Sequence, residues 1–228
     1  MKLLLTNDDG IDAAGLAALA AAAQTLGRLT WVAPHTTLSG CGHRVTTDGP
    51  IRIFPKGDTR WAIDGTPADC VRVALAKLAP DVDWVLSGMN HGGNLGVDVH
   101  HSGTVAAVRE AVFHGKPGIA VSHYRKRGAE FDWPRAQQWM TKILADLLQE
   151  SWTPGTFWNV NLPNLGPHDP EPRVIYCPLE IGPLPLNFRA GADWLHYDGD
   201  YHGRPRVAGS DVDVCFAGNI AVTKLALG

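Results

Sequence analysis

The stretch Leu3–Gly10, which reads Leu-Leu-Leu-Thr-Asn-Asp-Asp-Gly, indicates both the fold and the place of a ligand site. The three leucines predict a short buried strand, and the Asn-Asp-Asp-Gly that follows has the residues of a turn. In an open α/β sheet, ligands bind at the carboxyl ends of the strands. The adjacent carboxylates of Asp8 and Asp9 repel each other there unless protons or a cation separate them. They suggest a divalent metal, with a plain polar turn as the alternative.

The segments after this turn follow the order strand, helix, strand. Ala13–Leu26 is rich in Ala and Leu and is followed by Gly27, which predicts a helix that stops there. Leu29–Ala33 predicts a second strand, ended by Pro34. A unit of this kind predicts a parallel sheet with a right-handed crossover. After a polar loop over His35–Asp48, we expect strands at Ile51–Phe54 and Trp61–Ile63 (a hairpin), Asp83–Leu86, Gly118–Ser122, Phe157–Leu162, Val174–Cys177, Val212–Phe216 and Ile220–Leu225. We expect further helices at Pro67–Leu78, Thr104–Phe113 and Pro134–Glu150.

The length and texture of the chain predict one α/β domain over residues 1–228. We expect a Rossmann-like core with the active site in residues 1–150, built on a mostly parallel sheet flanked by helices. After about Thr153 the chain turns to prolines, aromatics and short apolar runs. Residues 151–228 are therefore expected to form a β-rich C-terminal extension.

Composition excludes several classes of protein. The net charge of −3 gives no broad basic surface, so no nucleic-acid duplex is expected as a partner. The four cysteines form no C-x-x-C pair, which argues against a structural zinc site, and no disulfide framework is expected. The apolar run at the start stops after three residues, and no stretch has the length of a membrane span. We expect a cytoplasmic protein that does not bind membranes.

A second motif, Ser102-Gly103-Thr104, immediately precedes a predicted helix. A helix start exposes free backbone N–H groups and the positive end of the helix dipole, which suits a phosphate. Plain N-capping by Ser102 or Thr104 is the alternative. The glycine-rich segment His91–Gly96 lacks the spacing of a dinucleotide fingerprint, and its glycines more simply allow a backbone to approach a ligand.

Three features thus fall at predicted strand ends: a carboxylate pair, a glycine-rich strand exit and a phosphate-type helix start. Together they predict a metal-assisted phosphate site. Five histidines lie in the same loops, and one or two are expected to line the pocket as phosphate donors or proton carriers: His35, His43, His91, His100 and His101. No G-x-S-x-G elbow is present. The adjacent carboxylates also depart from the D-x-D of haloacid-dehalogenase phosphatases, which argues against a covalent aspartyl-phosphate.

Taken together and in order, several segments resemble the survival-protein-E (SurE) family of nucleotidases over about the first 125 residues. They are Leu3–Gly10, Val32–Pro34 with Ser39-Gly40, Gly65–Val71, Ser87–Asn90, and Gly92–Gly96 through Ser102–Val105. The resemblance implies a Rossmann-like fold and one divalent cation, Mg²⁺ or Mn²⁺, with Ca²⁺ an alternative in a crystal. It implies that Asp8, Asp9, Ser39 and Asn90 hold this cation, with Asp8, Asp9 and Asn90 also catalytic. Asn94, Ser102, Gly103 and Thr104 are expected to bind the substrate phosphate.

The activity that the resemblance implies is hydrolysis of nucleoside 5′- and 3′-monophosphates to nucleoside and phosphate. Two other functions stay open: a haloacid-dehalogenase-like phosphatase with an aspartyl intermediate, and a catalytically silent nucleotide-binding module. The oxygen-donor set argues against the silent module, because binding alone does not need paired carboxylates.

The resemblance also implies a homodimer or homotetramer, built partly through the C-terminal region. The stretch Gly182–Gly209 carries the aromatic residues Phe188, Trp194, Tyr197 and Tyr201 with little periodicity. Such a stretch is either a lid over the chain's own site or an arm that reaches a partner. The C-terminal end resembles the family only loosely, since Lys224 stands where a proline is usual and the usual closing helix is missing.

Overall fold

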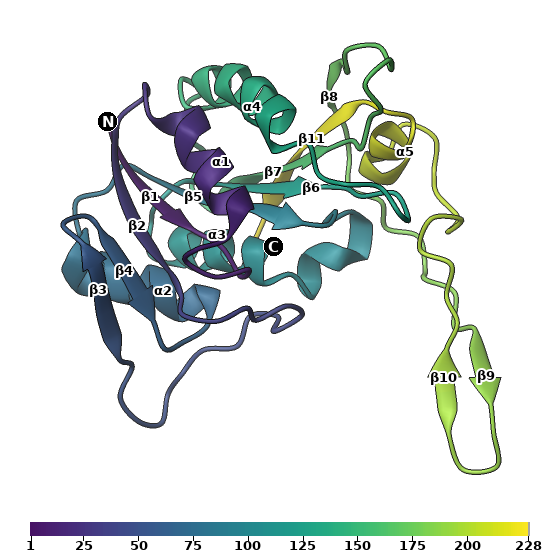
Figure 1. The fold of residues 1–228 in the computed structure, drawn as a ribbon, viewed down its shortest axis with the longest axis horizontal. Coiled ribbons are helices and arrows are strands. Elements are labelled where there is room, and N and C mark those ends of the chain that lie inside the picture. The colour runs from purple at the N-terminus through teal and green to yellow at the C-terminus, as the bar shows by residue number, and fades with distance from the viewer. Residues whose placement is uncertain (228) are drawn as a thin grey trace.

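The fold is built on one mixed β-sheet, and the computed structural model describes it over residues 1–227 (Figure 1). Within that range the sheet has nine strands in the order β3-β4-β2-β1-β5-β6-β7-β11-β8. The strands are β1 (Lys2–Thr6), β2 (Arg28–Pro34), β3 (Ile53–Gly57), β4 (Arg60–Ile63), β5 (Trp84–His91), β6 (Gly118–His123), β7 (Thr156–Leu162), β8 (Val174–Tyr176) and β11 (Ile220–Ala226). The strands from β4 to β7 are parallel, whereas β3 and β11 run antiparallel to their neighbours β4 and β7.

Helices cover both faces of this sheet. Helices α1 (Ala14–Ala23) and α4 (Trp133–Leu147) pack side by side on one face, and α2 (Pro67–Val73) and α3 (Gly103–Phe113) on the other (Figure 1). A π-helical segment, Ala74–Leu78, continues α2, and a short 3₁₀ helix, Gly96–His100, precedes α3. The predicted α/β fold class, a mostly parallel sheet flanked by helices, is confirmed.

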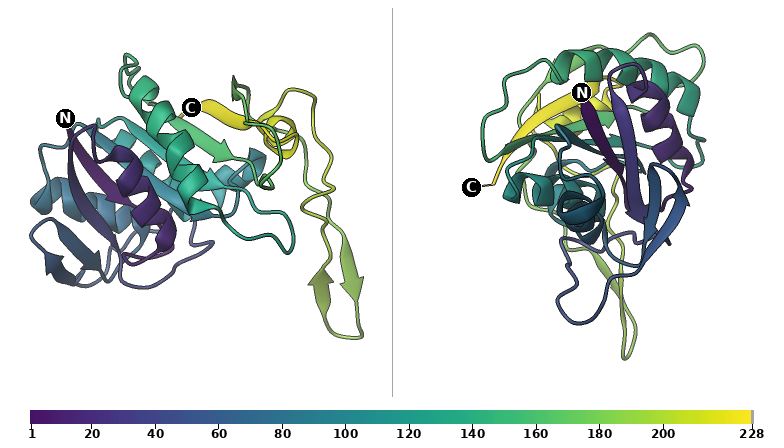
Figure 2. Two further views of the ribbon diagram at one scale, coloured as in Figure 1. Left: turned by 45° about the horizontal axis from the view of Figure 1, so that its top comes forward. Right: turned by 90° about the vertical axis from the view of Figure 1, so that its left-hand side faces the viewer.

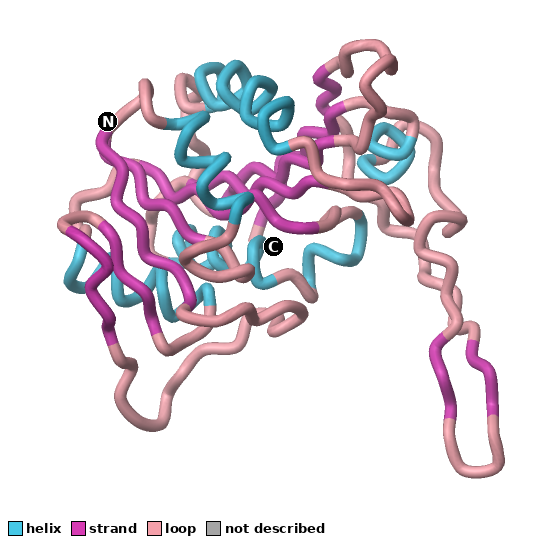
Figure 3. The backbone as a smooth tube through the Cα atoms, in the orientation of Figure 1, coloured by secondary structure: helices cyan, strands magenta, loops and turns pink. Residues whose placement is uncertain are grey.

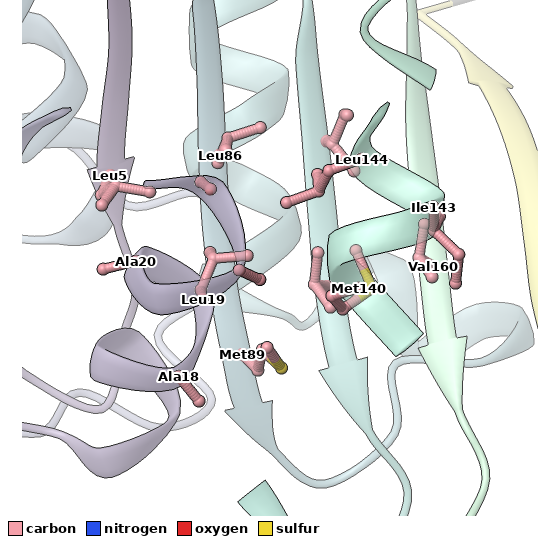
Figure 4. Packing of buried hydrophobic residues seen from close by; sticks show 14 of the residues in the cluster. Leu5, Ala18, Leu19, Ala20, Leu86, Met89, Met140, Ile143, Leu144 and Val160 are labelled. Atoms are coloured by element: carbon pink, nitrogen blue, oxygen red, sulfur yellow. The ribbon is translucent and has the colours of Figure 1, made fainter. Parts of the chain in front are cut away.

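The first strand shows why the sequence favours this arrangement. Leu3 and Leu5 join the hydrophobic core beneath α1 and α4, and Leu4 joins the core beneath α2 and α3. A strand buried on both faces needs a continuous apolar run instead of an alternating one. Figure 4 shows the first of these cores, which Leu19 of α1 and Met140 of α4 share with Leu5, Leu86 and Val160 of the sheet.

The order of the strands creates a topological switch point between β1 and β5. From β1 the chain builds outward through β2 to β4, and it then returns to β5 on the other side of β1. The two strands pair in register, with Thr6 opposite Ser87. Residues that follow β1 and residues at the end of β5 therefore share one edge, which is where an open α/β sheet binds its ligands.

Most predicted elements are present with ends shifted by a few residues, but β5 runs on to His91. The predicted strand Val212–Phe216 is wrong, because Asp211–Phe216 forms helix α5. The side chain of Ser210 accepts a hydrogen bond from the Asp213 backbone N–H at 3.4 Å, and acids fill the first turn. This Ser-Asp-x-Asp start is a helix signal that outweighs the β propensity of the valines.

The C-terminal extension contributes β7, β8 and β11 to the main sheet and also forms a separate arm. The arm is the segment Leu184–Tyr201, and it carries a two-stranded antiparallel hairpin of β9 (Phe188–Ala190) and β10 (Leu195–Tyr197). Figures 1 and 2 show the hairpin projecting away from the body, and Figure 3 shows the long loops that connect it.

The four cysteines are free thiols, and Cys70 and Cys215 are buried. No helix among residues 1–227 has both the length and the apolar character needed to cross a membrane.

Candidate active site

The turn after β1 presents the two carboxylates at the switch point. The Asn7 side chain closes this turn, since its Nδ2 donates to the Gly10 carbonyl at 2.9 Å and its Oδ1 accepts from the Gly10 N–H at 3.1 Å. Gly10 has a φ of +105°, a conformation that side-chain-bearing residues rarely adopt. The turn thus depends on Asn7 and Gly10, and it leaves the side chains of Asp8 and Asp9 free for other contacts.

Asp8 is the buried member of the pair, with 5% of its surface exposed. The Thr104 hydroxyl donates to its Oδ1. Gly103 lies so close that a Cβ there would be 2.9 Å from Asp8 Cβ and 3.1 Å from its Oδ2. Burial raises the pKa of Asp8 to about 6, the charge of Asp9 adds to the rise, and the Thr104 hydrogen bond partly offsets it. A charged Asp8 is costly here unless a cation accompanies it.

Asp9 and Asn90 lie on the more open side of the same edge. Asp9 Oδ2 accepts the His91 backbone N–H at 3.1 Å and lies 2.7 Å from His91 Nδ1. The Asn90 amide donates to the Gly92 carbonyl at 2.8 Å. The rings of Phe131 and Trp133 pack edge-on against the His91 ring, at 5.1 and 5.0 Å between centroids, and hold it in place.

The predicted ligand Ser39 lies in the loop next to this pair. The Leu38 N–H donates to the Asp8 carbonyl at 2.8 Å, and the Thr37 hydroxyl donates to the Asp9 carbonyl at 3.0 Å. These two bonds tie the loop to the carboxylate turn. The Ser39 side chain is exposed and makes no side-chain hydrogen bond to residues 1–227.

The donor set fits a hard cation. Among residues 1–227, Asp8 Oδ2, Asp9 Oδ1 and Asn90 Oδ1 have no hydrogen-bond donor, so carboxylate and amide oxygens remain available at the edge. Oxygen-only sets suit Mg²⁺, Mn²⁺ or Ca²⁺. The described chain holds no group of three or more His, Cys, Asp or Glu arranged for a metal, so such a cation would depend on two carboxylates and neutral oxygens.

The start of α3 faces the same point. Ser102 is the N-cap, and its hydroxyl accepts the Val105 N–H at 3.1 Å. The Thr104 hydroxyl is already used by Asp8. The backbone N–H groups of Gly103 and Thr104, in contrast, have no acceptor within residues 1–227. Free donors at a helix start favour an anion, so the backbone of this turn is the part suited to phosphate.

Asn94, an expected phosphate ligand, is buried in a hydrogen-bond network with Ser122 and two asparagines of β7. Its side-chain amide donates to Ser122 Oγ at 2.7 Å, and its backbone N–H donates to Asn161 Oδ1 at 2.8 Å. Asn159 and Asn161 both donate to its carbonyl. In this arrangement Asn94 fixes the glycine-rich loop. The polar alternation Asn-Val-Asn in a predicted strand was the available signal for this network.

Comparison with known proteins agrees with this geometry. The model of the family described as "Survival protein SurE" matches residues 3–178. A Nostoc sp. protein named "Putative 5'-nucleotidase alr3139" is 52% identical over 225 residues, covering 99% of each chain. The "5'-nucleotidase SurE" of Pelobacter propionicus is 42% identical over 177 residues, covering 77% of this chain and 71% of that protein.

A solved structure matches the whole fold. The crystal structure of the SurE protein from Aquifex aeolicus superposes with a TM-score of 0.89 at 30% sequence identity. The match covers 100% of this chain and 94% of the other. The family match, the nucleotidase relatives and the shared fold confirm the predicted resemblance and its enzyme class, phosphoric monoester hydrolase. The chain belongs to the SurE family.

Proposed function

We propose that this protein hydrolyses nucleoside 5′-monophosphates, and 3′-monophosphates as well, with the help of one divalent cation. The observation that carries the proposal is the contact between the Asp8 turn and the start of α3. It brings oxygen ligands for a cation within reach of free N–H donors for a phosphate. The names of the relatives support the 5′-nucleotidase class.

We infer that Asp8, Asp9 and Asn90 hold the cation, with Ser39 as the fourth ligand. When bound, such a cation neutralises phosphate charge and makes a bound water more acidic. The chain fixes these ligands from behind: Thr104 restrains Asp8, and His91 restrains Asp9. Ligands restrained in this way bind a metal more tightly, because less freedom is lost when it binds.

The roles of the other residues follow from their free atoms. The N–H groups of Gly103 and Thr104 bind the equatorial oxygens of the phosphoryl group, where charge develops during transfer. A carboxylate oxygen of Asp8 or Asp9 orients the attacking water and takes its proton. Attack in line with the leaving nucleoside oxygen breaks the bond from that oxygen to phosphorus, and the nucleoside leaves as an alcohol after taking a proton from solvent, without a covalent intermediate.

The decisive experiment is a phosphate-release assay on nucleoside monophosphates after removal of metals by a chelator. We expect activity to disappear and to return when Mg²⁺ or Mn²⁺ is added. No hydrolysis of any nucleoside monophosphate with either ion would contradict the proposal. The configuration at a chiral phosphorus separates the two mechanisms: direct water attack inverts it, and an aspartyl intermediate retains it.

We also propose that the protein is a homo-oligomer, at least a dimer, assembled through the arm. Leu186 and Leu195 are 83% and 68% exposed, and Phe188, Trp194 and Tyr197 are exposed beside them. Exposed aromatic and apolar residues grouped in this way are typical of interfaces. Light scattering on the intact protein at micromolar concentration is the test, and a monomer there contradicts this assembly.

A further inference from the structure

A second set of contacts connects the C-terminal extension to the loop that precedes α3. Arg204, at the root of the arm, is 4% exposed. Its Nη1 donates to both carboxylate oxygens of Asp98, at 3.2 and 3.1 Å, and its Nη2 donates to the Leu95 carbonyl at 3.2 Å. A buried guanidinium with three such bonds is held in one geometry.

Asp98 transmits this restraint to the start of α3. Its Oδ2 accepts the Leu95 N–H at 3.2 Å, which fixes the beginning of the 3₁₀ turn. Its carbonyl accepts the N–H groups of His101 and Ser102, each at 3.0 Å. Ser102 in turn caps α3, so the chain of contacts from Arg204 ends at the N–H groups proposed to bind phosphate.

Two more residues of the extension hold the same loop. The Tyr201 hydroxyl donates to Asp98 Oδ2 at 2.9 Å, and Asp211 Oδ2 accepts the Gly96 N–H at 2.8 Å. The guanidinium of Arg204 lies over the Tyr201 ring, 4.4 Å from its centroid. The loop therefore rests on side chains that lie more than 100 positions later in the sequence.

We infer that Arg204 is a positioning residue for phosphate binding: through Asp98 it sets the place of the turn that opens α3. This inference rests on the proposed function, since it assigns the substrate's phosphate to that turn. It extends the site beyond the N-terminal core, because the extension then determines how well the core binds its substrate.

The chain offers a matched control. Arg206 lies two residues away, packs over the same Phe216 ring as Arg204, at 5.3 against 5.8 Å, and contacts the carboxylate of Asp213 at 3.4 Å. It is more exposed and makes no hydrogen bond to the loop before α3 within residues 1–227. The Arg206→Met variant therefore removes the same charge and ring contact without touching the turn.

The test compares Arg204→Met with Arg206→Met in steady-state kinetics and in the binding of inorganic phosphate. We expect Arg204→Met to lower kcat/KM by about 10- to 100-fold, as small misplacements of binding groups do. The loss should appear mainly in KM, with a parallel loss of affinity for inorganic phosphate. The activation constant for Mn²⁺ should change much less than the phosphate affinity, because Asp8 contacts this turn through Thr104 whereas Asp9 is held by His91. Arg206→Met should behave as the parent protein in all three measurements.

Two milder variants cover the case in which Arg204→Met does not fold. Arg204→Lys keeps the charge but cannot donate to Asp98 and to the Leu95 carbonyl in the same way. Its phosphate affinity should therefore lie between those of the parent protein and Arg204→Met. Tyr201→Phe removes only the hydroxyl that donates to Asp98, so it should weaken phosphate binding less than Arg204→Met does. Equal phosphate affinities in the parent, Arg204→Lys and Tyr201→Phe proteins would overturn the inference.

Calorimetric titration with inorganic phosphate keeps this test separate from the proposed function. If the parent protein binds phosphate but hydrolyses no nucleotide, the proposed function fails and the inference is still tested by the Arg204 variants. If the parent hydrolyses nucleotides and the Arg204 variants bind phosphate equally well, only the inference fails.

Discussion

The sheet edge that carries Asp8 and Asp9 and the arm both depart from the usual placement of side chains, but in opposite ways. At the edge, charged and polar groups such as Asp8 and Thr104 are buried. In the arm, apolar side chains such as Leu186 and Leu195 are exposed to water. Both arrangements cost free energy in the isolated chain. Each surface is thus incomplete alone: a small charged ligand suits the first, and a second protein surface suits the other.

The largest effect is expected from Asp9→Asn. Even residues that only support metal ligands cost about 10- to 100-fold in affinity or activity when they are replaced, so a charged ligand should cost more than about 100-fold. The fold should be retained, since Asn relieves repulsion with Asp8. Asp12→Asn, on the same segment but largely exposed, is the control. Full metal-dependent phosphate release by Asp9→Asn would remove Asp9 from the site.

A smaller but still large loss is expected from Gly103→Ala. The new methyl group would lie 2.9 Å from Asp8 Cβ and 3.0 Å from Cys41 Sγ, so the helix start and the carboxylate must separate. We expect activity to fall by about 100-fold, the scale of a 1 Å misplacement, although Ala favours a helix. Gly166→Ala meets nothing closer than 3.5 Å and should be neutral. Unchanged kinetics in Gly103→Ala would show that this close contact is not needed.

Glu110 differs from Asp8, because this buried carboxylate has hydrogen-bond partners for both of its oxygens inside the chain. It accepts from Arg72 Nε at 2.6 Å, and His43 Nε2 and His114 Nε2 lie at 2.7 and 2.9 Å. Burial raises its pKa, but the hydrogen bonds from these three residues outweigh burial and lower the pKa to about 2. The pKa of Asp8 moves the other way, to about 6. The charged form of Glu110 is thus stabilised by residues of the chain itself, whereas the charged form of Asp8 is not.

The pH dependence of stability tests this difference. The folded pKa of Glu110 lies below its ordinary value of 4.5, so its contribution is full above that pH and is lost as the pH falls toward 2. Glu110→Gln should lower the free energy of unfolding by about 2–3 kcal/mol at pH 7. Its deficit relative to the parent should shrink between pH 5 and pH 3 in denaturant titrations, while exposed Glu150→Gln shows no deficit. A constant deficit would mean that charge is not involved.

The smallest effect on activity is expected from shortening the arm. Residues 185–199 can be replaced by a short Gly-Ser linker that keeps Tyr201 and Arg204 in place. The hydrogen bond from Tyr197 Oη to the Pro185 carbonyl joins two residues of the replaced segment, so its loss breaks no contact with the body of the protein. We expect light scattering to show a smaller assembly, with kcat and the unfolding temperature of the protomer nearly unchanged. An assembly of unchanged size would indicate that the arm is a lid over the active site. In that case we expect the shortened protein to accept a different range of substrates.

Local signals in the sequence were enough to predict much of the fold. The Asn7–Gly10 turn closes through the side chain of its own first residue, and α2 begins with a reciprocal cap between Thr66 and Asp69. The buried character of β1 follows from three consecutive leucines. In the turn and in the cap the interacting groups lie three positions apart, so the local sequence specifies their geometry.

Other features depend on the tertiary structure. Thr104 meets Asp8 across 96 positions, and Arg204 meets Asp98 across 106. Neither pair is implied by its neighbours, because both exist only once the strand order has placed β1 beside β5 and the extension against the loop. The helix at Asp211–Phe216 combines the two kinds of feature, since its local cap opposes the β propensity of the valines and a buried cluster with Tyr124 and Leu95 holds the helix in the fold. The sequence alone therefore indicates which side chains are suited to bind a cation or a phosphate, and the sheet topology brings those residues together at one edge.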